Sequence, residues 1–151
     1  MKGDCLNIVT ACSTGTHCVG EAYRLIRFGL ADAALAGGTE EGITNMSLAG
    51  FGNLGAITKS DDPMKAGLPF DARRSGFVAG EGAGALVLES LEHAQARGAN
   101  IIAEITGFGS TGDAYHMTAP EPSGEGAVRA MRQALAEGGF SPEDVGHLNA
   151  H

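Results

Sequence analysis

The chain has 151 residues, of which 18 are acidic and 10 are basic, giving a formal charge of −8. This length allows one domain with its own core, and the acidic balance argues against a nucleic-acid-binding protein, which carries a basic face. All apolar runs are shorter than the ~20 residues of a membrane span, and the first residues lack the apolar centre of a signal peptide. Three cysteines cannot form a complete disulfide framework, which favours a reducing compartment. Together these features lead us to expect a soluble, cytoplasmic protein.

Short apolar runs alternate with helical patterns in the first half of the chain. Residues 5–11 (CLNIVTA) predict a buried strand, because apolar and β-branched residues form a nearly continuous run. The helical spacing from Val19 to Ile26 predicts a helix that Gly29 ends. Residues 31–38 (ADAALAGG) predict a second strand, and residues 39–75 predict a mixture of short helices and loops.

The second half of the chain continues this alternation. Residues 82–90 predict a strand and residues 91–98 a short helix that Gly98 ends; residues 100–109 predict another strand. Residues 124–139 predict a helix capped by Ser123, Ser141 and Pro142 begin a short helical turn, and residues 145–151 enter a last strand. The alternation predicts an α/β fold with a largely buried sheet. Residues 96–100 are the expected boundary between two groups of strands and helices.

Cys12 stands where the first predicted strand turns into the first predicted helix. The positive end of a helix favours the thiolate, which is the nucleophilic form of cysteine. The small residues Ser13–Thr16 leave space for a substrate, and free N–H groups of the turn can hydrogen-bond an oxyanion. The simpler interpretation is a packed, inert thiol, which suits Cys5 and Cys18 better.

Two other chemistries are not favoured by the pattern. Cys12, His17 and Cys18 are too close together for the paired spacing of zinc ligands, so we expect no metal. Residues 80–84 (GEGAG) precede a strand and lack the Lys-Ser/Thr ending of a phosphate loop.

The blocks of the sequence resemble, in order, the β-ketoacyl-acyl carrier protein synthases, and most closely their synthase II type. Residues 10–17 (TACSTGTH) are similar to the active-site cysteine motif of these condensing enzymes of fatty-acid synthesis. Further blocks that resemble the family are residues 31–40, 69–99, 103–120 and 148–151 (LNAH). The resemblance covers essentially the whole chain.

The resemblance implies a partial thiolase-like fold. Residues 1–97 would be the latter part of the N-terminal half and residues 98–151 the beginning of the C-terminal half. The strand before Cys12 would pair with its copy across a homodimer axis. The implied partner is acyl carrier protein, loaded with an acyl or a malonyl group, and no cofactor is implied.

The resemblance also implies roles for single residues. Cys12 matches the nucleophile that takes the acyl group, and His151 matches a histidine that hydrogen-bonds the thioester oxygen during decarboxylative condensation with malonyl-carrier protein. Asp113 and His116 match a block near the active-site entrance, and Phe51 matches a residue near the acyl pocket. For these three, structural roles remain open alternatives, and His17, His93 and His147 are interpreted as structural or exposed.

The sequence departs from the family pattern in two ways. It lacks the family's second histidine, a nearby lysine and a late GFGG segment, so we expect an internal fragment that does not condense substrates by itself. Leu68 stands where the family pattern has an arginine, and Gly55 stands where some relatives have a basic residue. Four other basic residues remain as candidates for docking a carrier protein, and the alternative is that they form an ordinary solvated charge run. These candidates are Lys59, Lys65, Arg73 and Arg74.

Three alternatives remain open at this point. A polyketide ketosynthase shares the chemistry and differs in substrate. A non-catalytic ketosynthase-like dimer partner would carry another residue in place of Cys12. A cysteine hydrolase would stop after acylation of Cys12 and hydrolysis.

Overall fold

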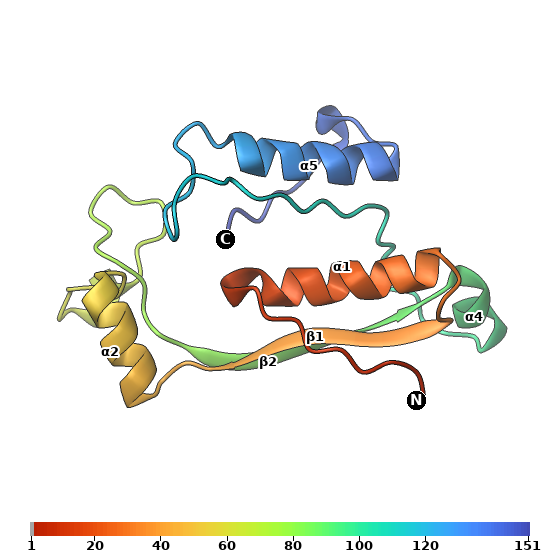
Figure 1. Cartoon of the computed structure of the whole chain (residues 1–151), viewed down its shortest axis with the longest axis horizontal. Coiled ribbons are helices and arrows are strands. Elements are labelled where there is room, and N and C mark those ends of the chain that lie inside the picture. The colour runs from red at the N-terminus through yellow and green to blue at the C-terminus, as the bar shows by residue number, and fades with distance from the viewer. Residues whose placement is uncertain (1) are drawn as a thin grey trace. The chain divides into compact units, whose positions relative to one another are not determined.

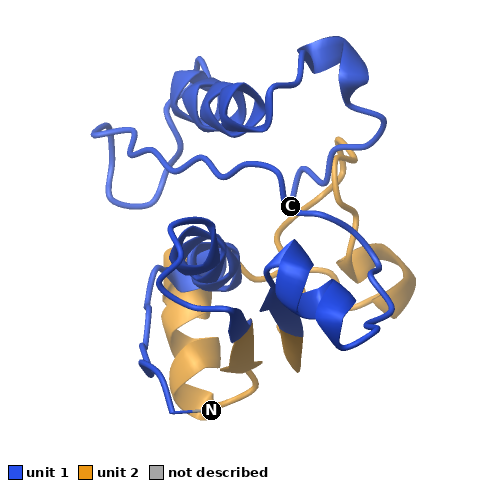
Figure 2. Ribbon diagram, turned by 90° about the vertical axis from the view of Figure 1, so that its right-hand side faces the viewer, with its two compact units in different colours: residues 1–36, 86–151 blue, residues 37–85 orange. Residues whose placement is uncertain are grey.

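The computed structural model describes residues 2–151, which divide into two compact units (Figure 2). Unit 1 comprises residues 2–36 and 86–151, and unit 2 comprises Gly37–Ala85. The one domain expected from the length is therefore divided in this structure. The elements are the 3-10 helix η1 (Ala11–Ser13), α1 (Thr14–Arg27), β1 (Ala33–Glu41), α2 (Asn45–Leu54), α3 (Pro63–Ala66), β2 (Glu81–Glu89), α4 (Leu91–Ala96), α5 (Glu125–Gly138) and the 3-10 helix η2 (Pro142–Asp144) (Figure 1).

The two strands β1 and β2 form a two-stranded sheet. Backbone contacts join Asp32 to Ser90 near one end of the pair and Gly42 to Gly80 near the other, so the strands run antiparallel. Both strands were expected from the sequence, and so were α1, α4 and α5. The capping box of Ser141 and Asp144 confirms the helical turn at Pro142.

Three predicted strands do not form. Residues 5–10, 100–109 and 145–151 have no regular secondary structure. A strand is defined by its ladder of hydrogen bonds to a neighbour, and apolar composition alone supplies none. Gly124 is the N-cap of α5 and offers no side chain. The expected cap at Ser123 nevertheless forms from one residue earlier, since its hydroxyl accepts the N–H of Glu125, the first residue of the helix, at 3.3 Å.

Side chains of α1 and α5 replace a strand partner along residues 105–111, which we call the extended segment. The Tyr23 hydroxyl donates to the carbonyl of Thr106 at 3.1 Å. The N–H of Phe108 donates to Glu137 at 3.0 Å, and the N–H of Ser110 donates to the side chain of Gln133 at 3.3 Å. Alternate residues of the segment are therefore satisfied by two helices, which explains an extended backbone without a ladder.

Two glycines let the extended segment lie directly against α5. A Cβ on Gly107 would stand 2.1 Å from the carbonyl oxygen of Ala134, and one on Gly109 would stand 1.9 Å from that of Ala130. The period of two along the segment matches the four-residue spacing of the two alanines on the helix. Residues 107 and 109 must therefore remain glycine for this packing.

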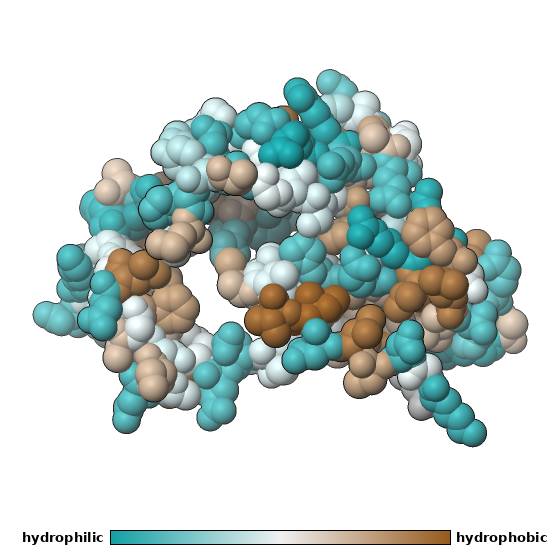
Figure 3. Space-filling view, viewed as in Figure 1, coloured by the Kyte–Doolittle hydropathy of each residue, from teal (hydrophilic) through white to brown (hydrophobic). Residues whose placement is uncertain are grey.

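The buried core is small. In unit 1, Ala22, Tyr23, Ala36 and Leu88 form the buried cluster, and Val19, Ile26, Ala34 and Phe108 pack against it. Ala, Leu, Val and Ile make up most of this cluster, as the composition with few aromatic residues suggests. Other aliphatic side chains stay outside it, since Ile102 is 94% exposed and Val9 is 79% exposed. Strongly hydrophobic side chains consequently lie on the surface, as the brown areas of Figure 3 show.

Unit 2 has its own aromatic contact. Phe51 of α2 meets the ring of Phe77 edge to face at 5.1 Å, and Ile57 and Phe77 form an isolated parallel bridge. Mixed short helices and loops were expected here, and α2 and α3 confirm that prediction. Across residues 2–151, no helix is long and apolar enough to cross a membrane.

Candidate functional site

Cys12 lies exposed in η1, directly before the first turn of α1. The preceding residue, Ala11, has φ +52°, a left-handed conformation that costs a non-glycine residue about 1–2 kcal/mol. The backbone thus bends sharply at the residue before the thiol. Such strain persists only where the surroundings hold it, and it gathers at functional sites.

The bend is closed by bonds between the residues on either side of Cys12. The carbonyl of Thr10 accepts the N–H of Ser13 at 3.2 Å and the Ser13 hydroxyl at 2.7 Å. Ser13 makes no side-chain cap for α1, and the first turn of α1 contains no acidic residue. The positive end of a 14-residue helix therefore lies beside the Cys12 thiol without a competing anion.

His17 is a functional candidate that sequence reasoning took for structural or exposed. It is half-buried, and its ring bonds to hydroxyls on both sides of Cys12 and to Ser110 of the extended segment. The signal available in the sequence was its position, five residues after the cysteine, which is little more than one helical turn.

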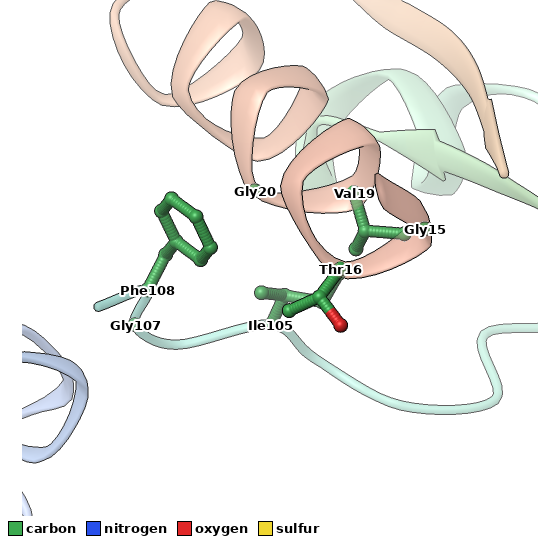
Figure 4. Close-up of a pocket in the computed structure, with 7 residues that line it drawn as sticks. All are labelled: Gly15, Thr16, Val19, Gly20, Ile105, Gly107 and Phe108. Carbon is green, nitrogen blue, oxygen red and sulfur yellow. The ribbon is translucent and has the colours of Figure 1, made fainter. Parts of the chain in front are cut away.

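An open groove begins one turn beyond Cys12. Its volume is about 390 Å³, and its lining residues are Gly15, Thr16, Val19 and Gly20 of α1 and Ile105, Gly107 and Phe108 of the extended segment (Figure 4). Gly15, Thr16 and Val19 lie three, four and seven residues after Cys12, which belongs to η1 and does not itself line the groove. The groove offers a mostly apolar surface along α1.

Gly20 allows the ring of Phe108 to form one side of the groove. A Cβ at this position would stand 2.4 Å from the ring of Phe108. The absence of a side chain lets the ring pack on the helix, where the guanidinium of Arg24 also lies 4.9 Å from its centroid.

A carboxylate behind Phe108 is held in its ionised form. The N–H of Phe108 is the main cause that lowers the pKa of Glu137, and the Tyr23 hydroxyl and Arg27 lower it further. Glu137 therefore anchors the extended segment to α1 and α5 as an anion, and it does not act as a proton donor at neutral pH.

His151 is exposed, and its N–H donates to the side chain of its neighbour Asn149 at 2.9 Å. In the described part of the chain, no hydrogen bond joins His151 to Cys12. Figure 1 marks the C-terminus on the side of α1 where η1 begins. The structure therefore places the predicted pair in unit 1 without bringing the two side chains into contact through a hydrogen bond.

Asp113 and His116 are bonded within their own loop. Oδ2 of Asp113 accepts the N–H of Glu121 at 2.9 Å. Oδ1 packs so closely against Gly126 that a Cβ added to this glycine would be only 1.8 Å from it. Nδ1 of His116 accepts the N–H groups of Thr118 and Ala119 at 3.2 and 3.1 Å. These contacts give both residues a structural explanation.

Phe51 and the basic docking candidates belong to unit 2. Phe51 is 43% exposed beside Phe77. Lys65 pairs with Asp62 at 3.0 Å, and Arg73 pairs with Asp71 at 2.7 Å and is the main cause that lowers the pKa of that carboxyl. Of the four docking candidates, Lys59 and Arg74 form no ion pair, so these two remain for an acidic partner.

Across residues 2–151, no three His, Cys, Asp or Glu side chains gather in a way that could hold an ion.

Comparison with known proteins gives two family matches along the chain. The family described as "Beta-ketoacyl synthase, N-terminal domain" matches residues 1–94, and "Beta-ketoacyl synthase, C-terminal domain" matches residues 102–151. Among curated proteins, the chain is 58% identical over 143 residues to 3-oxoacyl-[acyl-carrier-protein] synthase 2 of Staphylococcus aureus, covering 95% of this chain and 36% of the relative. It is 53% identical to the enzyme of the same name from Rhizobium meliloti, covering 100% of this chain and 36% of the relative.

Solved structures agree with these matches. A β-ketoacyl synthase from Burkholderia phymatum superposes with a TM-score of 0.87 at 44% identity, over 93% of this chain and 34% of that one. A type II polyketide synthase acyl carrier protein in complex with its ketosynthase bound to the hexaketide gives a TM-score of 0.84 at 40% identity, over 87% and 33%. The chain thus spans about a third of the length of the relatives it matches.

Proposed function

Because the chain belongs to the β-ketoacyl synthase family, we propose that it carries the nucleophile of a 3-oxoacyl-[acyl-carrier-protein] synthase of fatty-acid biosynthesis. The observation that carries the proposal is the exposed Cys12 at the strained turn before α1. The fold is the partial thiolase-like α/β fold of the matched ketosynthases. Residues 1–97 and 98–151 belong to the two halves of that fold in our proposal.

Cys12 is the acyl acceptor in the proposed reaction. Its thiolate attacks the carbonyl carbon of an acyl-carrier protein, the C–S bond to the carrier breaks, and the carrier leaves as a thiolate that takes a proton from water. The N–H groups at the start of α1 are available to hydrogen-bond the oxyanion of the intermediate. The acyl chain then lies along the apolar groove over Val19 and Ile105.

Condensation is the second step. Malonyl-carrier protein loses CO₂, its carbanion attacks the carbonyl carbon of acyl-Cys12, and the Cys12 thiolate leaves as the carbon–carbon bond forms. His151 donates a hydrogen bond to the thioester oxygen as negative charge develops there. Asp113, His116 and Phe51 are proposed to contact substrate, although their observed bonds also serve the fold.

The partners follow the same proposal. The relatives are named for acyl carrier protein, and one matched structure holds a carrier protein with its ketosynthase. Carrier proteins are acidic, and Lys59 and Arg74 would attract them. A homodimer through residues 5–11 is supported by the exposure of Leu6 at 65% and Val9 at 79%, and a cytoplasmic location rests on the cysteine count alone.

We expect the 151-residue chain to accept an acyl group at Cys12 without condensing it. The test incubates the purified chain, and a Cys12→Ala control, with acyl- and malonyl-carrier proteins. The expected result is no 3-ketoacyl product from either. A product from the chain that the control does not form would contradict the expected inactivity while supporting Cys12 as nucleophile.

A polyketide ketosynthase is the second candidate, favoured by the 40% identity to a type II polyketide system. The identity of 58% to fatty-acid enzymes is higher. Acylation of Cys12 by a saturated acyl-carrier protein, in preference to a polyketide-loaded one, separates the two.

A further inference from the structure

The ring of His17 joins three hydroxyl groups that surround the Cys12 turn. Nδ1 lies 2.7 Å from the Thr10 hydroxyl and 3.3 Å from that of Ser13. Nε2 lies 2.8 Å from the hydroxyl of Ser110. The edge of the ring faces Phe108, with 6.0 Å between centroids and an interplanar angle of 82°.

The hydrogen bonds assign the ring proton. The Ser13 hydroxyl donates its one proton to the carbonyl of Thr10 at 2.7 Å. Its oxygen can then only accept from His17, so Nδ1 carries the proton and shares it between Ser13 and Thr10. Nε2 is left as the acceptor of the Ser110 hydroxyl proton.

This arrangement holds both sides of the strained residue. Thr10 precedes Ala11, whose φ is +52°, and Ser13 follows Cys12. A ring that donates to both hydroxyls opposes the relaxation of the turn toward ordinary backbone angles.

The far end of the ring is anchored independently. Ser110 belongs to the extended segment, and its N–H donates to Gln133 of α5. The Cys12 turn is therefore tied, through one imidazole, to a part of unit 1 nearly a hundred residues away in sequence.

We propose that His17 is a positioning residue for Cys12, fixing the thiol at the positive end of α1 by clamping Thr10 and Ser13 and bracing them on Ser110. The inference rests on the proposed function only in that Cys12 is the acyl acceptor. His17 itself makes no contact with substrate in this proposal.

The contributions of Nδ1 and Nε2 of His17 can be tested separately by substitution. An Asn side chain places its amide near the position of Nδ1, and a Gln side chain places its amide near that of Nε2. His17→Asn thus keeps the clamp on Thr10 and Ser13, whereas His17→Gln keeps only the bond to Ser110.

The test measures alkylation of Cys12 by iodoacetamide, with peptide mass spectrometry and with the exposed Cys5 as internal reference. His17→Ala should slow Cys12 by about three- to tenfold, because the thiol is no longer held beside the N–H groups at the start of α1, and should leave Cys5 unchanged. His17→Asn should restore most of the rate and His17→Gln should not. His93→Ala, which removes a histidine bonded to Glu89, is the matched control and should leave Cys12 unchanged.

Equal Cys12 rates in the chain and in His17→Ala would overturn the proposal, as would equal rates in the Asn and Gln variants. If His17→Ala loses its helical circular dichroism, Ser13→Ala decides instead: a slower Cys12 supports the clamp and an unchanged one overturns it. Alkylation needs no acyl donor. Normal alkylation without acyl transfer would therefore overturn the proposed function and leave the positioning role standing.

Discussion

The Cys12 turn and the C-terminal residues 145–151 are organised very differently, although both belong to unit 1. Around Cys12, side chains and backbone between Thr10 and His17 bond to one another and to Ser110. Around His151, the residues are exposed, and the one hydrogen bond of its N–H goes to Asn149. The turn that holds Cys12, the proposed nucleophile, is thus supported by contacts within residues 10–17 and by the distant Ser110, while His151 has no comparable support.

The two regions depend on different kinds of contact. The hydrogen bonds among residues 10–17 join groups a few positions apart, so they do not depend on other strands of a sheet. A residue positioned by a sheet depends on neighbouring strands, and residues 145–151 have none in this structure.

The largest expected effect comes from separating the extended segment from α5. Gly109→Val should lower the free energy of unfolding by about 3 kcal/mol, because its side chain would overlap the carbonyl of Ala130. Urea unfolding followed by circular dichroism measures it, with Gly112→Ala as the control at a position that has nothing within 4 Å. Equal stabilities of the two variants would show that the segment is not packed as described.

The next largest effect is expected at Ala11, the strained residue of the Cys12 turn. Ala11→Val should destabilise the chain by about 2 kcal/mol, since a β-branched residue tolerates a left-handed backbone poorly. Ala11→Gly should not destabilise it by more than about 0.5 kcal/mol, since glycine relieves the strain but gains freedom when unfolded. The same urea experiment measures both, and a stable Ala11→Val variant would argue against the bend.

A smaller effect is expected from acid at the end of β2. Arg97, with help from His93, lowers the pKa of Glu89 from its ordinary 4.5 to about 2. The lowered value means that Glu89 stabilises the fold above pH 4.5 and loses this contribution as pH falls toward 2. Thermal unfolding between these pH values should be steeper in pH for the chain than for Glu89→Gln, and parallel profiles would contradict the ion pair.

The smallest effect is expected at the unsupported end. His151→Ala should change the free energy of unfolding by less than about 0.5 kcal/mol, because the side chain is exposed. It should also leave alkylation of Cys12 unchanged. A clear loss of stability would mean that the C-terminal residues are better organised than the structure indicates.

The sequence predicted those elements whose signals are local. Helical spacing and glycine endings located α1 and α4, and the apolar runs around Ala36 and Leu88 located β1 and β2. The position of Cys12 before a helix was also predictable, because a turn and a helix start have local signatures.

The sequence did not predict what depends on partners. Residues 5–11 and 100–109 have strand composition, yet neither has a neighbouring strand to bond. The role of His17 was also missed, because its bond to Ser110 joins residues far apart in sequence. The contact of Gly109 with Ala130 is of the same kind.

The proposed function requires that Cys12 accept an acyl group from a carrier protein. The most direct measurement is peptide mass spectrometry of the chain after incubation with a carrier protein loaded with a saturated acyl chain. We expect one thioester-linked acyl group on the peptide containing Cys12, none on Cys5 or Cys18, and none in Cys12→Ala. An unmodified Cys12 that still reacts with iodoacetamide, or an adduct that persists in Cys12→Ala, would contradict it.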